Sequence, residues 1–132
     1  MKIDLIIPPD PFLGDDKRNS PLGLLYIAAV SKQAGHDVNI KDLRGKEIDD
    51  LKDLDFEREV YGITSSTPSY YSSGNLAKRI KSQNSTALTV LGGIHATALP
   101  NKIGPEFDKV VIGEGENSFL EILKDNEKKE NK

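Results

Sequence analysis

Small and hydroxyl-bearing residues follow several apolar stretches of this chain, and residues of these types can line a ligand site. One stretch ends in Thr64-Ser65-Ser66-Thr67, another in Gly92-Gly93, and a third in Gly113-Glu114-Gly115-Glu116. Hydroxyl groups donate and accept hydrogen bonds, and glycine lets a ligand approach the backbone. Tight turns use the same residue types, so any one of these loops taken alone is better explained as a turn. A site requires that the fold bring the loops together.

The order of the expected elements indicates how the loops are placed. Apolar runs typical of buried strands are expected at residues 3–7, 37–41, 59–64, 87–91 and 109–112. Helical patterns are expected at residues 20–34, 44–57, 72–82 and from 116, with at most a short helix at 96–103. Regular alternation of strand and helix predicts a parallel sheet with helices on both faces. Five strands favour an α/β, flavodoxin-like (Rossmann-like) three-layer sandwich with a five-stranded parallel sheet in the order 2-1-3-4-5.

Length and composition narrow the function classes. The 132 residues suit one domain, expected at 1–124, followed by a polar tail at 125–132 that frays. The net charge is −3 with no basic stripe, which argues against nucleic acid as a partner. The absence of cysteine excludes disulfides, thiolate catalysis and a Cys-bound iron–sulfur cluster. No apolar run is long enough to span a membrane, so a cytoplasmic protein is expected.

Ligands of open α/β sheets bind beyond the carboxyl ends of the strands, where the loops at 8–20, 64–71, 92–97 and 113–118 would meet. A phospho-accepting receiver needs an acidic pair after strand 1 and an aspartate after strand 3. The chain has Pro8-Pro9-Asp10 and Thr64-Ser65-Ser66 there, so the acceptor is missing. In the first loop, Asp15-Asp16 would repel the phosphate of FMN. Neither class fits.

Five segments resemble one known family. They are PP-D-P from Pro8, PLGLLYIAAVSKQAGHDV (21–38), YGITSSTPSY (61–70), LGGIHATALP (91–100) and VVIGEGENSFLEIL (110–123). In this order and spacing they resemble the B12 (cobalamin)-binding domain found N-terminal in cobalamin-dependent radical SAM enzymes. The resemblance covers nearly the whole chain.

The resemblance implies that cobalamin lies with its corrin over the strand ends and its nucleotide tail in a slot between strands 3 and 4. The implied cofactor-binding residues are Asp10, Phe12, Leu13 and Gly14 beneath the cobalt, Thr64, Ser65, Ser66, Thr67, Gly92 and Gly93 along the slot, Gly113, Glu114, Gly115 and Glu116 near the corrin edge, and Tyr70, Ile94, His95 and Ala96 at the mouth. Tyr70 and Tyr71 either cover the corrin or pack on the helix. His95 either contacts the corrin or its amides, or only hydrogen-bonds within its loop.

Many members of the wider superfamily supply a cobalt-ligating histidine from the first loop. This chain has no histidine between Met1 and Gly35, so the resemblance implies base-off cobalamin without such a ligand. No protein ligand to the metal is assigned, and a cobalt bond from His95 is not expected. His36 follows Gly35 at a helix exit, on the other edge of the expected sheet, and is assigned a structural role.

No catalysis is expected of the chain alone, because S-adenosylmethionine cleavage needs a cysteine-bound cluster that this sequence cannot hold. We expect a stand-alone cobalamin carrier, or a module that serves a radical SAM or other corrinoid enzyme in trans. Two alternatives remain open: a truncated domain of a radical SAM methyltransferase, and a non-catalytic interaction or regulatory module with a degenerate cofactor site.

Overall fold

The elements alternate between strand and helix along the chain. The computed structural model describes residues 1–8, 22–43, 56–65, 70–93, 103–111 and 116–130. In chain order the elements are β1 (Lys2–Ile7), α1 (Leu22–Gln33), β2 (Asp37–Asp42), β3 (Val60–Thr64), α2 (Tyr70–Gln83), β4 (Leu88–Gly92), β5 (Lys109–Val110) and α4 (Glu116–Glu130). None of the helices in these ranges is both long enough and apolar enough to cross a membrane.

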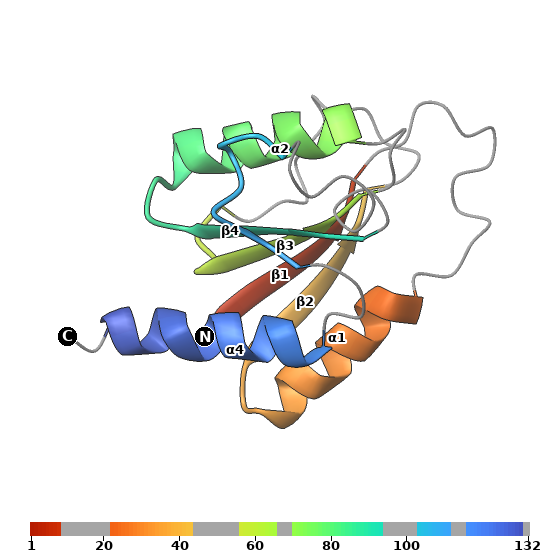
Figure 1. Cartoon of the computed structure of the whole chain (residues 1–132), viewed down its shortest axis with the longest axis vertical. Helices are drawn as coiled ribbons and strands as arrows, with labels where there is room; N and C mark the ends of the chain where they lie inside the picture. The colour runs from red at the N-terminus through yellow and green to blue at the C-terminus, as the bar shows by residue number, and fades with distance from the viewer. Residues whose placement is uncertain (9–21, 44–55, 66–69, 94–102, 112–115, 131–132) are drawn as a thin grey trace.

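The five strands form one parallel sheet in the order β2-β1-β3-β4-β5. Helices α1 and α4 lie side by side on one face, and α2 covers the other (Figure 1). The predicted flavodoxin-like class and strand order are therefore confirmed. Because every strand runs the same way, all the carboxyl ends meet at one edge, and each helix begins near it.

Strand alternation divides the core into two apolar clusters. On the α2 face, Leu76, Ala77 and Ile80 pack against strand residues that include Tyr61 and Leu91. The α1/α4 face has its own cluster, whose members are Ile3, Leu5, Ile7, Leu24, Ala28, Val38, Val60, Val90, Val111, Phe119 and Leu123. Successive residues of a strand point to opposite faces, which explains why the central strands read as continuous apolar runs.

Most described element boundaries agree with the sequence-based expectation to within one residue, and three differ by more. Helix α2 begins at Tyr70 rather than near 72, and β5 has two residues instead of four. Helix α4 continues through Glu130, past the point at which the polar tail is expected. Its last turns are polar but carry opposite charges three residues apart, as in Asp125 and Lys128, which favour helix. The helices expected at 44–57 and 96–103 fall mostly outside the described residues.

A buried ion pair joins the central strands at their amino ends. Asp4 of β1 is fully buried, and its Oδ1 lies 3.0 Å from Nε of Arg58, which precedes β3. The same guanidinium donates hydrogen bonds to the carbonyls of Ile3 and Asp37, each at 3.1 Å. One side chain therefore connects β1, β2 and the start of β3.

Replacing Arg58 by methionine should lower the free energy of unfolding by about 3–5 kcal/mol, because Asp4 would lose its buried counter-ion. The double variant Asp4→Leu/Arg58→Met should recover much of that loss, since it leaves no unpaired charge. Urea denaturation measures both. The matched control Lys78→Met removes an exposed cation from α2 and should change stability by less than about 0.5 kcal/mol. A loss below about 1 kcal/mol for Arg58→Met would contradict this role.

A second polar network holds the start of β5 against β4. Asp108 Oδ2 accepts hydrogen bonds from Lys81 Nζ at 2.5 Å and from the backbone N–H of Thr89 at 2.9 Å. Lys81 also donates to the carbonyl of Ala87 at 2.6 Å. Burial raises the pKa of Asp108, but the hydrogen bonds from Lys81 and Thr89 outweigh burial and hold the pKa below its ordinary value.

A carboxylate whose pKa is lowered by folding stabilises the protein above its unfolded pKa, and that contribution is lost as the pH falls through the folded pKa. The unfolding free energy should therefore decline below about pH 4, near the ordinary value of 3.8 for Asp108. Both Asp108→Asn and Lys81→Met should reduce the decline, because each removes the interaction that lowers the pKa. Urea denaturation at pH 7 and pH 3 measures the difference. Identical declines in the wild type and both variants would disprove the assignment.

Candidate functional site

The carboxyl ends of β3 and β4 lie directly beside each other. Thr64 and Gly92, the last residues of these strands, are partners in the register. The backbone N–H of Ser65 donates to the carbonyl of Gly92 at 3.0 Å, which extends the pairing one residue past the end of β3. Two loops that the sequence places 27 residues apart are thus brought together at one point of the sheet edge.

Gly93 directly follows β4, and its backbone lies against the end of β3. Its φ of +101° lies in the left-handed region that disfavours side chains. A Cβ on Gly93 would lie 2.7 Å from the carbonyl oxygen of Ser65 and 2.7 Å from Oγ1 of Thr64. The chain's own backbone therefore occupies the space that a side chain at Gly93 would need, and the fold alone explains this glycine.

Gly92 is different, because a side chain at this position has room. A Cβ there would have one heavy-atom neighbour in ordinary contact, Cβ of Val111 at 3.9 Å. Val111 belongs to the α1/α4 face, as does Val90 two residues before Gly92. Of the two glycines, Gly92 is therefore the one whose bare backbone is free to face a ligand on that side of the sheet.

Below Gly92, protein side chains fill the same face. A Cβ on Gly62 of β3 would lie 2.7 Å from Cδ2 of Leu5 and 3.6 Å from the ring of Phe119. Thr64 follows two residues later and falls on the same face by strand alternation. Leu5 and Phe119 thus form a floor, above which the described ends of β3 and β4 present the Thr64 side chain and the bare backbone of Gly92. This donor set fits a flat aromatic arm with polar groups, which would lie above the floor rather than between the deeper core residues.

The first turn of α2 is fixed beside this point. Ser73 is fully buried, and its Oγ donates to the carbonyl of Thr64 at 3.5 Å. Ser73 is not among the residues predicted for the site, although the small residues Ser72-Ser73-Gly74 near the start of a helix indicate that the helix approaches a strand closely.

Tyr70, at the start of α2, is committed to the protein's own core. Its hydroxyl accepts a hydrogen bond from the backbone N–H of Gly104 at 2.8 Å. Its ring lies 6.3 Å from that of Phe107 in a tilted arrangement. Both ends of the side chain are engaged, so Tyr70 supports the edge of the site by packing.

Thr64, Ser65, Tyr70, Gly92 and Gly93 are the expected site residues whose side chains or backbone the structure describes. Helix α4 begins at Glu116, although the side chain of that residue is not among those described. The remaining members lie outside the described residues: Asp10, Phe12, Leu13, Gly14, Ser66, Thr67, Ile94, His95, Ala96, Gly113, Glu114 and Gly115.

His36 lies at the opposite, amino edge of the sheet. Its Nδ1 is 3.1 Å from the amino group of Met1 and 3.7 Å from a carboxylate oxygen of Glu127 on α4. Burial of the ring and the charge on Met1 lower the pKa of His36. These contacts join β1, the start of β2 and α4, far from the ends of β3 and β4.

The parallel sheet and its strand order define a flavodoxin-like α/β domain. The chain belongs to the B12 binding domain family, whose model matches residues 17–123. It is 34% identical over 135 residues to an uncharacterized methyltransferase of Pyrococcus horikoshii, covering 93% of this chain and 29% of that protein.

Two further relatives extend the comparison. The chain is 32% identical to a cytidylyl-2-hydroxyethylphosphonate methyltransferase of Streptomyces wedmorensis, covering 76% of this chain and 23% of that protein. It is 29% identical to an anaerobic magnesium-protoporphyrin IX monomethyl ester cyclase of Rubrivivax gelatinosus, covering 78% of this chain and 20% of the relative. The chain therefore spans less than a third of the length of each of these curated relatives.

Solved structures show the same fold at low sequence identity. The N-terminal domain of a hypothetical protein of Thermotoga maritima matches with a TM-score of 0.55 and 21% identity, over 85% of this chain and 90% of that one. The response regulator protein TrrA of Thermotoga maritima matches with a TM-score of 0.59 and 12% identity, over 94% of this chain and 98% of the regulator. These likenesses concern the scaffold alone.

The two glycines should respond differently to the same substitution. Gly93→Ala should lower the unfolding free energy by at least about 2 kcal/mol, because the left-handed backbone costs about 1–2 kcal/mol and overpacking adds about 1–3 kcal/mol. Gly92→Ala should change it by no more than about 1 kcal/mol, since the added methyl group makes ordinary contact and restricts the unfolded chain. Urea denaturation of the pair provides the measurement. Equal losses in both variants would show that the glycines do not divide these roles.

Proposed function

We propose that this chain binds cobalamin at the carboxyl edge of its sheet, with the nucleotide arm between the ends of β3 and β4. The proposed form is base-off, with no histidine from the first loop. Membership of the B12 binding domain family supports the cofactor class. The single observation that carries the location is the bare backbone of Gly92 beside Thr64, above the floor made by Leu5 and Phe119.

Each described residue has a simple part in this proposal. The Thr64 hydroxyl can donate to a ring nitrogen or a phosphate oxygen of the arm. The backbone at Gly92 lets a flat ring lie against the chain. Leu5 and Phe119 close the apolar side and keep water from the base of the arm. When bound, cobalamin would supply cobalt-centred chemistry, while the protein sets its position.

The partner is proposed to be a catalytic domain or protein of the methyltransferase or radical SAM type. The support is that relatives named as methyltransferases carry most of their length outside the matched segment. This chain has no cysteine for a radical SAM cluster, so that chemistry would come from the partner. The module would hold the corrinoid and present it for the reaction.

Binding can be tested by mixing the purified protein with hydroxocobalamin and passing it over a desalting column. The wild type should emerge coloured, with the absorption spectrum of the base-off form. Colourless protein would reject cobalamin binding and favour the alternative of an interaction module with a degenerate site. A base-on spectrum would retain the cofactor but reject the proposed placement of its arm.

The location can be tested with Gly92→Val, which adds bulk above the floor while its Cβ meets only ordinary contacts. Retention of hydroxocobalamin should fall at least tenfold, with the circular dichroism spectrum unchanged. Ser85→Val is the matched control, because it introduces the same valine in place of a small residue at an exposed position before the amino end of β4. Unchanged retention by Gly92→Val would place the arm elsewhere.

A further inference from the structure

The outer face of α2 is polar except at its first turn. Its exposed residues are Tyr71, Lys78, Arg79, Ser82 and Gln83. Tyr71 is 79% exposed, more than the other exposed large hydrophobic residues, Leu25 at 44% and Tyr26 at 63%. The outer face of α2 is otherwise polar. An exposed aromatic side chain at its first turn therefore indicates that a ligand contacts this end of the helix.

The first turn of α2 borders the carboxyl edge of the sheet, where cobalamin is proposed to bind. Helix α2 follows β3 and begins at the carboxyl edge of the sheet (Figure 1). The Ser73 hydroxyl, bonded to the carbonyl of Thr64, holds this first turn against the end of β3. Side chains on a helix lean toward its N-terminus, which favours an orientation of the Tyr71 ring toward the same edge.

The two consecutive tyrosines have different environments. The hydroxyl of Tyr70 is bonded to Gly104 and its ring packs near Phe107, so this side chain is occupied. Tyr71 is turned about 100° further round the helix and is exposed. Of the pair, Tyr71 is therefore the one available for contact with a bound molecule.

We propose that Tyr71 is a corrinoid-binding residue, whose ring covers the apolar periphery of the corrin on the α2 side. This inference rests on the proposed function, since it requires cobalamin at the carboxyl edge. An aromatic ring suits this task because it buries a large area with only two rotatable bonds to order. The contact is packing, and the tyrosine hydroxyl is not required for it.

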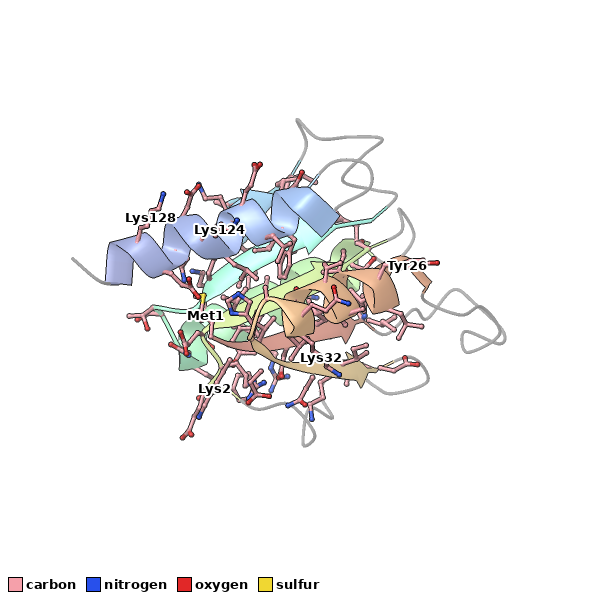
Figure 2. The ribbon with its side chains drawn as sticks, turned by 90° about the horizontal axis from the view of Figure 1, so that it is seen from below. Met1, Lys2, Tyr26, Lys32, Lys124 and Lys128 are labelled. Carbon is pink, nitrogen blue, oxygen red and sulfur yellow. The ribbon has the colours of Figure 1, made fainter. Side chains whose placement is uncertain are left out.

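Tyr26 offers a matched control on the same molecule. It belongs to α1, on the opposite face of the sheet from α2, and Figure 2 shows its side chain extending away from the ribbon near the start of that helix. It is the fifth residue of α1, so it lies about 6 Å along the helix axis from the start. Tyr26 shares the residue type and the exposure of Tyr71 but not its place beside β3.

Nitration of tyrosine measures directly whether bound hydroxocobalamin covers the ring of Tyr71. The full chain is treated with tetranitromethane, with and without saturating hydroxocobalamin, and modification at each tyrosine is measured by mass spectrometry. Tyr71 should be protected at least threefold by hydroxocobalamin, relative to Tyr26 as the internal standard. Tyr61, which is fully buried, should remain unmodified in both samples. Equal nitration of Tyr71 in both samples, with the cofactor retained, would overturn the inference.

Variants supply a second, independent measurement. Tyr71→Ala should weaken hydroxocobalamin binding about fivefold to tenfold, Tyr71→Phe should bind like the wild type, and Tyr26→Ala should have no effect. Wild-type affinity in Tyr71→Ala would overturn the inference while leaving the proposed function intact. Failure of the wild type to retain hydroxocobalamin would instead reject the proposed function, so the two failures are distinguishable.

Discussion

The close approach of β4 to β3 at Gly93 is the constraint on which the candidate site depends. A backbone with φ of +101°, lying against the carbonyl of Ser65 and the hydroxyl of Thr64, leaves no room for a side chain. This approach brings the preceding Gly92 beside Thr64 at the carboxyl edge. The fold therefore requires one glycine, whereas its neighbour has room for a side chain, although the two are indistinguishable in the sequence.

The two edges of the sheet carry different kinds of interaction. The amino edge holds the buried pair of Asp4 and Arg58 and, at the start of β5, the network of Lys81 and Asp108. At the carboxyl edge, the ends of β3 and β4 have small side chains and bare backbone, and α2 begins with an exposed aromatic ring. Charged networks at one edge stabilise the register of the strands, which leaves the other edge available for binding.

The scaffold by itself does not set the chemistry. A response regulator of Thermotoga maritima shares the fold with a TM-score of 0.59, yet this chain lacks the strand-end aspartate that a phospho-accepting site needs. Proteins named as methyltransferases share its sequence over less than a third of their length. The residues at the strand ends matter for the chemistry, because the parallel sheet presents whatever residues follow each strand at the same place.

The sequence by itself determined the order of the elements, because strand alternation and apolar runs depend on local patterns. That a ligand lies at the carboxyl edge of the sheet stays a prediction. The sequence also determined the family resemblance, which the match over residues 17–123 confirms. Only the tertiary structure decided which of the two glycines has room for a side chain. It also decided that Tyr70 packs inward while Tyr71 is exposed, and that Arg58 pairs with Asp4, 54 positions away in the sequence. These outcomes depend on contacts between segments far apart in the chain, and the spacing of residues along the sequence carries no record of such contacts.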